Sequence, residues 1–373
     1  MKAGWEEKTV GEILRLEYGK PLDEKDRKSN GLYPAYGANG EKCRTDMFYY
    51  DEPSIIVGRK GSAGEINLTE GKFWPLDVTY FVRFDNNSHD LRFLYYLLGT
   101  LDLVKLAKGV KPGINRNDVY SQIARIPRLS EQQRIVTLLD EAFEALATAK
   151  ANAEQNLQNA RALFESHLDS VFRQHRNLWK QKTLEEIATT FGRGKSKHRP
   201  RNDPKLYGGK YPFIQTGDVR NAEHFITEYS QTYSEAGLAQ SKLWPKGTIC
   251  ITIAANIAET AILDFDACFP DSVIGIVVNP EEADVGFVEY LLQSFKARIK
   301  AEGKGSAQAN INLGTFEDQQ FPFPPVADQK HIVAKLDSLR VETQRLTAIY
   351  ERKLAALEEL KMSLLHQAFN GEL

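Results

Sequence analysis

The sequence is poor in cysteine and has no long hydrophobic run. Its three cysteines, Cys43, Cys250 and Cys268, are isolated and odd in number, which argues against a disulfide framework and gives no zinc-ligand spacing. We expect them to act as small buried apolar residues. No apolar run is long enough to cross a bilayer, and the N-terminal residues lack the apolar stretch of a secretory signal. These absences predict a cytoplasmic protein with no membrane contact.

The chain also lacks an excess of charge of either sign. Its 48 basic and 50 acidic residues give a net charge of -2 over 373 residues. The distribution of charge says more about partners than the total does, and one basic stretch stands out. Between Arg193 and Lys210 the only acidic residue is Asp203, and glycines and prolines break the stretch into a loop. This loop could follow a nucleic-acid backbone, or it could be an ordinary solvated surface loop.

What the sequence does contain is a long internal repeat. Five residues of the first half return at the same spacing in the second: Trp5, Lys8, Thr9, Glu12 and Ile13 match Trp179, Lys182, Thr183, Glu186 and Ile187. Later in each half, Ile135, Val136, Leu139 and Asp140 match Ile332, Val333, Leu336 and Asp337. Solenoid repeats run at roughly 20 to 50 residues, so a repeat this long predicts two copies of a whole domain.

Each half closes with a long amphipathic pattern. Apolar residues recur at steps of three and four from Ile135 to Leu163, and again from Ile332 through Leu360 to Leu364, with Thr343 and Lys353 as polar exceptions. A seam of this length predicts two long helices that pair as an antiparallel coiled coil. About 40 residues at ~1.5 Å each would give a rod of roughly 60 Å. The alternative is that each helix only caps its own domain.

The sequence therefore predicts an α+β protein with two repeated mixed α/β domains separated by two long helices that form an antiparallel coiled coil. We place the domains at residues 1–128 and 176–326, and the helices at residues 129–175 and 327–373.

Two matched loops in the domains carry residues suited to phosphates or base edges. The turn at residues 58–64 follows a buried-strand pattern and offers two cations and a hydroxyl, together with backbone N–H groups. The loop at residues 108–115 shares its Lys-Gly and Ile-Asn with the loop at residues 304–312. Plain hairpin turns, or turns held by asparagine side chains, are the alternative interpretation.

Taken together, these motifs resemble the DNA-specificity subunits of Type I restriction-modification enzymes. The resemblance covers essentially the whole chain and rests on the Trp-x-x-Lys-Thr-x-x-Glu-Ile opening of each half, the turn at residues 58–64, the loop from Lys304 to Asn312, and the Pro-Pro-x-x-Asp-Gln-x-x-Ile-Val segment from Pro324 to Val333. It implies two target recognition domains that each read one half of a split site in double-stranded DNA. It also implies two modification subunits, which bind S-adenosylmethionine and methylate adenine, and restriction subunits that translocate and cut DNA.

The residues that we expect to contact DNA come from the matched loops, the basic loop and the segments after two Tyr-Pro pairs. They are Lys20, Tyr36, Asn39, Arg59, Lys60, Ser62, Lys108, Lys111 and Asn115 in the first copy, and Arg193, Lys195, Lys197, Arg199, Gln215, Thr216, Arg220, Asn256, Lys304, Ser306, Gln308 and Asn310 in the second. The second copy has no Arg-Lys-Gly around Ala254 to Ile257, so we do not transfer contacts from one copy to the other.

The sequence gives no sign of catalysis by this chain. The cofactor loop and the Asn/Asp-Pro-Pro-aromatic motif of an adenine methyltransferase are both missing, and Thr189 stands where the first glycine of a P-loop belongs. Asp271, Glu302 and Lys304 imitate the acids and lysine of a metal-dependent nuclease, but the first copy has Ala107 before Lys108 and no acid pair. We therefore expect no catalytic residue, cofactor or metal in this chain. The competing interpretation is a protein-assembly scaffold with a coiled-coil hub, and weak dependence of binding on salt would favour it.

Overall fold

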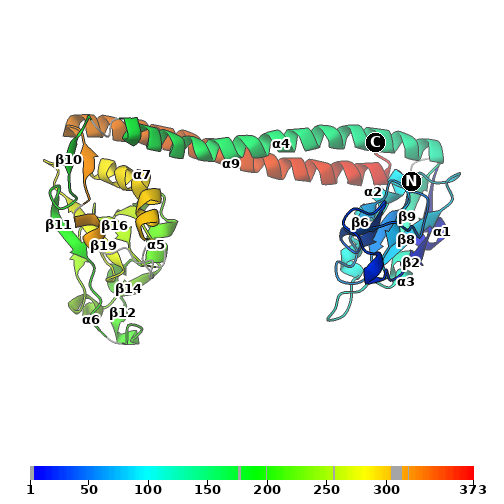
Figure 1. Ribbon diagram of the computed structural model, residues 1–373, viewed down its shortest axis with the longest axis horizontal. Helices are drawn as coiled ribbons and strands as arrows, with labels where there is room; N and C mark the ends of the chain where they lie inside the picture. The colour runs from blue at the N-terminus through cyan, green and yellow to red at the C-terminus, as the bar shows by residue number, and fades with distance from the viewer. Residues whose placement is uncertain (1–3, 175–177, 199, 255–256, 304–312, 318) are drawn as a thin grey trace. The chain divides into compact units, whose positions relative to one another are not determined.

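The computed structural model describes residues 4–174, 178–198, 200–254, 257–303, 313–317 and 319–373. The chain forms two compact units (Figure 1), Met1–Glu154 with Glu351–Leu373, and Gln155–Tyr350. Each unit joins one α/β domain to part of both long helices, α4 (Leu129–Gln174) and α9 (Val326–Asn370). Because the units cut across both helices, the four segment boundaries drawn from the sequence stay predictions.

The domain of the first unit is built from short strands in separate sheets. β1 (Trp5–Thr9) pairs with β9 (Ile123–Pro127); a second sheet has the order β2 (Leu14–Tyr18), β8 (Thr79–Phe84), β5 (Ile55–Gly58), β6 (Ile66–Leu68); a third has the order β4 (Gly40–Thr45), β3 (Tyr33–Gly37), β7 (Trp74–Pro75). The helical segments are α1 (Val10–Ile13), α2 (Leu91–Thr100), α3 (Arg116–Tyr120) and the 3-10 turns η1 (Glu24–Asp26) and η2 (Leu103–Leu106).

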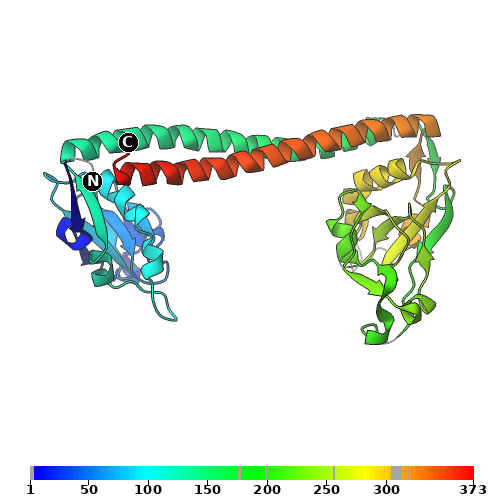
Figure 2. The same cartoon turned by 180° about the vertical axis from the view of Figure 1, so that it is seen from behind.

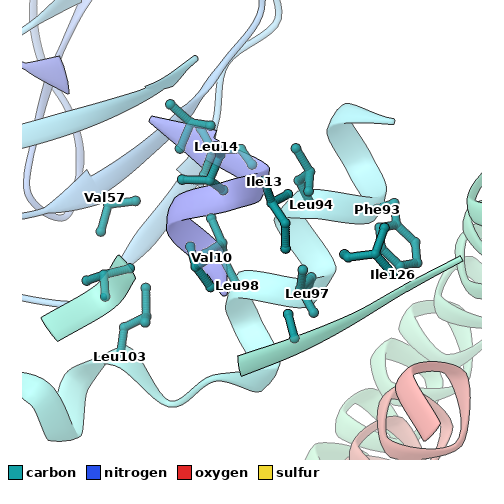
Figure 3. Close-up of a cluster of buried hydrophobic side chains, with 14 of the residues drawn as sticks. Val10, Ile13, Leu14, Val57, Phe93, Leu94, Leu97, Leu98, Leu103 and Ile126 are labelled. Carbon is teal, nitrogen blue, oxygen red and sulfur yellow. The ribbon is translucent and has the colours of Figure 1, made fainter. Parts of the chain in front are cut away.

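Helix α2 organises the core of this domain. Its N-terminus is capped by the Asp90 side chain, which accepts hydrogen bonds from the N–H groups of Arg92 and Phe93 at 2.9 and 3.0 Å. Residues one helical turn apart then share a face, and α2 buries Phe93, Leu94, Leu97 and Leu98 against α1, Val57 of β5 and Ile126 of β9 (Figure 3). The opposite end of the chain joins the same core, because the rings of Phe93 and Phe369 lie 5.0 Å apart.

The domain of the second unit repeats this plan with additional strands. β10 (Lys180–Lys182) pairs with β20 (Phe321–Phe323); one sheet has the order β11 (Ala188–Arg193), β19 (Val273–Val278), β16 (Ile249–Thr252), β17 (Thr260–Leu263), β13 (Phe225–Ile226); another has the order β14 (Gln231–Tyr233), β12 (Tyr207–Phe213), β18 (Ala267–Cys268), β15 (Leu243–Trp244). The helical segments are η3 (Pro204–Leu206), α5 (Thr216–Asn221), α6 (Glu235–Ala239), α7 (Val285–Gly303) and α8 (Gly314–Glu317).

The repeat seen in the sequence is a repeat of structure. In the first domain the Glu12 carboxylate accepts a hydrogen bond from the Thr9 N–H at 2.7 Å, and in the second Glu186 accepts one from Thr183 at 2.6 Å. The Tyr-Pro pairs also correspond, since they lie in β3 and β12, which pair in parallel with β7 and β18. Two copies of one mixed α/β domain are therefore confirmed.

The long helices pack antiparallel within each unit. In the first unit Ile135 and Leu139, near the start of α4, share a core with Leu364 and Phe369, near the end of α9. In the second unit the end of α4 shares a core with Leu336, near the start of α9. The predicted coiled-coil pairing is confirmed by these contacts (Figure 2).

The register of the helix seam differs from the prediction at particular residues. Leu163 and Leu360, expected in the seam, are 47% and 48% exposed, while Ala160 is buried and Phe164 packs on the core beside it. After Ala160 the seam therefore continues at Phe164, four residues on, and not at Leu163, three residues on, as we expected. Thr343 is buried despite its polarity, because its hydroxyl donates to the Leu339 and Arg340 carbonyls one turn earlier.

Each domain is fastened to its long helix by a buried glutamine, and we call this contact the glutamine clamp. The Gln132 amide oxygen accepts from the Asp90 N–H at 2.9 Å, and its nitrogen donates to the Pro127 carbonyl at 2.9 Å. Gln329 makes the same two contacts with Asp284 and Pro324, both at 2.8 Å. Both side chains are fully buried, so the clamp ties the domain helix, the last strand and the long helix together.

Two expectations about the chemistry of the chain can be compared with the structure. Cys250 and Cys268 are buried as predicted, and burial raises the pKa of both thiols, while Cys43 is only half-buried. Among the helices in the described residues, none is both long and apolar enough to span a bilayer.

Candidate nucleic-acid interface

The structure joins the two matched loops of the first domain into one surface. The Gly61 N–H donates to the Pro112 carbonyl at 3.1 Å and the Ile114 N–H donates to the Arg59 carbonyl at 2.9 Å, so residues 58–64 and 108–116 lie side by side. We call them the double-loop surface. It gathers Arg59, Lys60, Ser62, Lys108, Lys111 and Asn115, all of them predicted to contact DNA.

The backbone of the 58–64 turn has less to offer a ligand than the sequence suggested. The N–H groups of Arg59, Lys60, Gly61, Ala63 and Gly64 all donate to carbonyls of the protein. Accessible backbone N–H groups were therefore the wrong expectation at these five positions. What the turn presents outward is its side chains, above all the exposed Lys60.

Two predicted residues of this surface already have protein partners. Lys108 forms an ion pair with Asp118 at 2.9 Å, which offsets its charge. The Asn115 side chain caps α3 by accepting from the Asn117 N–H at 2.9 Å, which is the structural alternative considered for this loop. Lys111 remains exposed beside them.

Sequence reasoning missed two residues at the edge of the double-loop surface. The guanidinium carbons of Arg59 and Arg116 lie 5.4 and 5.1 Å from the ring centre of Tyr18, which is 46% exposed. Arg116 directly follows the matched Ile-Asn pair, and the second copy has Leu313 at that position. This difference between the copies was the only sequence signal that could have pointed to Arg116.

The remaining predicted residues of the first domain are Lys20, Tyr36 and Asn39. The Lys20 ammonium sits 4.8 Å from the ring centre of Tyr49, and Tyr36 packs edge-on against Phe73 with ring centres 5.9 Å apart. Tyr36 is half-buried, and burial raises the pKa of its hydroxyl. Asn39 is exposed in the turn between β3 and β4.

In the second domain the basic loop is partly neutralised by acids outside it. Arg201 makes a two-pronged pair with Asp271, both contacts at 2.9 Å, and Lys210 pairs with Glu235 at 3.3 Å. Arg193 donates to the Asp271 carbonyl at 2.8 Å. Lys195 and Lys197 stay exposed, so the loop presents fewer free charges than its sequence suggested.

A third cation, missed by the sequence analysis, lies near this loop. The Lys242 ammonium sits 3.6 Å from the ring centre of Trp244. The hydroxyl of Ser241, the residue before Lys242, donates to the Lys195 carbonyl at 2.9 Å. Burial, together with the charge of Lys195, lowers the pKa of Lys242.

Gln215 and Thr216 border a cavity of about 340 Å³ that also touches the basic loop. Its other walls include Arg201, Tyr207 and Gln231, so amide, hydroxyl, guanidinium and aromatic groups meet in one space. Gln215 precedes α5, and its N–H donates to the Asp218 carboxylate at 2.8 Å. Arg220, near the end of α5, is exposed.

A buried polar network lies between this domain and the long helices. The Glu289 carboxylate of α7 contacts the His224 ring at 2.7 Å and accepts from the Thr260 hydroxyl at 2.8 Å and the Gln293 amide at 2.6 Å. The Tyr290 hydroxyl next to it donates to Asp337 of α9 at 2.6 Å. Such a closed network positions the domain and needs no ligand, so we assign it no binding role.

Six of the predicted residues lie outside the described part of the chain: Arg199, Asn256, Lys304, Ser306, Gln308 and Asn310. Lys304 is part of the nuclease-like motif noted in the sequence, so the structure does not test that motif. Within the described residues, no group of three or more His, Cys, Asp or Glu is arranged to hold a metal ion.

The fold and its two surfaces define a class of protein: a tandem of α/β domains with cation-bearing loops, each docked on a pair of long antiparallel helices. The family model described as "Type I restriction modification DNA specificity domain" matches residues 2–158 and again residues 177–359. The chain belongs to this family.

Relatives and solved structures agree with the family. The chain is 22% identical to the Type I restriction enzyme EcoDI specificity subunit of Escherichia coli, over 99% of this chain and 88% of that protein. It is 26% identical to the EcoR124I/EcoR124II specificity subunit of Escherichia coli, over 72% and 68%. Both relatives are named as specificity subunits of Type I restriction enzymes.

Two solved structures share the fold along the whole chain. One, from a study of complex assembly and conformational transition of the type I R-M system, has a TM-score of 0.79 at 18% identity and covers 100% of this chain and 99% of its own. The HsdS subunit from Thermoanaerobacter tengcongensis has a TM-score of 0.67 at 18% identity, with coverage of 100% and 98%.

Proposed function

We propose that this chain is the sequence-recognition subunit of a Type I restriction-modification complex and binds a DNA site in two parts, one half for each domain. The observation that carries the proposal is that the specificity-domain family matches twice, once in each half. The double-loop surface supports it, because exposed arginine and lysine side chains on loops suit phosphates and base edges.

We further propose that the two domains read different sequences. The first presents Arg59, Lys60 and Lys111 around its double loop, whereas the second presents Lys195 and a cavity with glutamine and threonine walls. Glutamine can bond two atoms of adenine, and arginine two atoms of guanine, in the major groove. The phosphate contacts would set the register of each domain on its half-site.

The long helices would set the distance between the half-sites. α4 has 46 residues and α9 has 45, and at ~1.5 Å per residue such helices are roughly 69 Å long. That length corresponds to about two turns of B-DNA at ~34 Å per turn. We therefore expect several unread base pairs between the half-sites.

The partners follow from the same proposal. Two modification subunits would carry S-adenosylmethionine and methylate adenine, and restriction subunits would translocate and cut DNA, all in the cytoplasm. The target base must leave the stack before it can be methylated, and that step belongs to the modification subunits. This chain would supply position and sequence, with no cofactor of its own.

DNA binding at increasing salt tests the proposal. The complex would be purified through a tag on this chain, and its affinity measured for duplexes with and without the recognised site. We expect selective binding that weakens steeply with salt, because each neutralised phosphate releases counterions. Affinity that is indifferent to DNA sequence and to salt would contradict the proposal and favour a protein-assembly scaffold.

A further inference from the structure

We propose that Arg59 and Arg116, whose guanidinium groups both lie near the Tyr18 ring, form a binding site for a backbone phosphate of DNA in the first domain. The inference rests on the proposed function, because it takes a DNA duplex as the ligand. It assigns a role to Arg116 and Tyr18, which the sequence did not point to, and makes Lys108 a minor contributor.

The site is held in place before any ligand arrives. Tyr18 packs on Tyr80 with ring centres 5.1 Å apart, and the Tyr80 hydroxyl donates to the Ile114 carbonyl at 3.1 Å. Ile114 lies two residues before Arg116, whose position as the first residue of α3 is fixed by the Asn115 cap. The aromatic pair therefore anchors both the ring and the segment that carries one of the arginines.

The two arginine charges of the site are not offset by carboxylates of the described residues. Within the described parts of the chain, no carboxylate forms an ion pair with Arg59 or Arg116, although both guanidinium groups lie against the same ring. Both guanidinium carbons lie within 5.4 Å of one ring centre, so an anion that binds beside the Tyr18 ring would be attracted by both charges. Lys108 differs, because Asp118 already offsets its charge.

The geometry favours a phosphate over a base. The Arg59 guanidinium donates from Nε and from one terminal nitrogen to the Asp77 carbonyl, at 3.2 and 2.6 Å. Reading guanine needs two parallel N–H donors from one guanidinium, and this contact occupies one such pair. A phosphate can instead accept one bond from each of two arginines. Both guanidinium groups lie near the Tyr18 ring, which therefore fixes the position of the proposed phosphate site.

The experiment compares arginine variants of the full chain in the tagged complex, on duplexes with the intact first half-site and with an altered one. Arg116→Ala should weaken binding about tenfold on both duplexes and reduce the slope of log affinity against log salt by about 1, as expected for one lost phosphate contact. Arg116→Lys should keep the wild-type salt slope. Arg125→Ala is the matched control, because Arg125 is an exposed arginine of the same domain paired with Glu7, and it should change affinity less than twofold.

Two results would overturn the inference while leaving the proposed function intact. One is selective binding by the wild-type complex together with wild-type affinity and salt slope for Arg116→Ala. The other is a loss confined to the intact half-site with an unchanged slope, which would make Arg116 a base reader. Thermal unfolding of each variant checks the fold, and Arg116→Gln, which removes the charge but keeps most of the side chain, takes the place of the alanine variant with the same expected loss if that variant unfolds. Absence of selective binding by the wild-type complex would reject the proposed function itself.

Discussion

At the scale of single residues, the interior of each domain contains polar groups whose ionisation or removal should show in stability. Tyr80 is 2% exposed, and burial, together with its contact to Tyr18, raises its pKa to about 12. An unfolded tyrosine has a pKa near ~10. The fold therefore holds the Tyr80 proton over a pH range in which the unfolded chain has already lost it.

The sign of the resulting pH dependence is fixed. Between pH ~10 and pH ~12 the unfolded state binds fewer protons than the folded state, so the free energy of unfolding falls as pH rises. We expect Tyr80 to contribute roughly 1 kcal/mol to this loss between pH 9 and pH 11. Urea unfolding at pH 9 and pH 11 measures it, and Tyr80→Phe should shrink the difference. An equal difference in the variant would show that Tyr80 does not titrate in this way.

A second residue-scale prediction concerns Glu289 in the second domain. Glu289→Ala should lower the free energy of unfolding by about 3 kcal/mol, because it leaves His224, Thr260 and Gln293 without their buried acceptor. Chemical denaturation gives the value, with Glu281→Ala as an exposed control in the same domain. Equal stability of the two variants would mean that the network is dispensable.

At the scale of elements, the glutamine clamp makes the start of each long helix part of its domain. Gln132→Ala should cost about 3 kcal/mol, since the Asp90 N–H and the Pro127 carbonyl would lose a buried partner. Gln329→Ala should cost a similar amount in the second unit. Thermal unfolding tests both, and the exposed Gln133→Ala is the control for the first. A clamp variant as stable as its control would refute the assignment.

The elements also show how far the sequence could go. The repeat, the two domains and the helix pairing were predictable, because duplicated motifs and apolar spacing are local properties of the chain. The register near Leu163 was not, because Phe164 packs on the core of the second domain while Leu163 stays exposed. Near Leu163, the register of the helix seam is therefore determined by tertiary packing.

The candidate sites divide in the same way. The double loop could be predicted as two separate cationic loops, but their union depends on backbone hydrogen bonds between Gly61 and Pro112 that no spacing reveals. The free charge of each loop was harder to predict from the sequence. Lys108 pairs with Asp118, and Arg201 pairs with Asp271, which lies 70 residues away in the chain. The number of basic residues in a sequence run is therefore only an upper limit on the number of unpaired positive charges in the folded loop.

At the scale of the whole molecule, the proposed spacing role of the helices makes a numerical prediction. Lys150 of α4 pairs with Glu358 of α9, so residues 147–153 and 355–361 face each other. Deleting both heptads should shorten the helix pair by ~10 Å and the unread gap in the DNA site by about 3 base pairs. Binding selection from duplexes with varied gaps would measure it. An unchanged preferred gap would contradict the spacing role.

Mapping methylated adenines tests the central claim most directly, which is that each domain reads its own half of one DNA site. DNA would be sequenced from cells that carry this chain with its modification partners, and from the same cells without the chain. We predict methylation that depends on the chain, at a motif of two different half-sites separated by a fixed number of unread base pairs. A continuous motif, or the same methylation without the chain, would contradict the account.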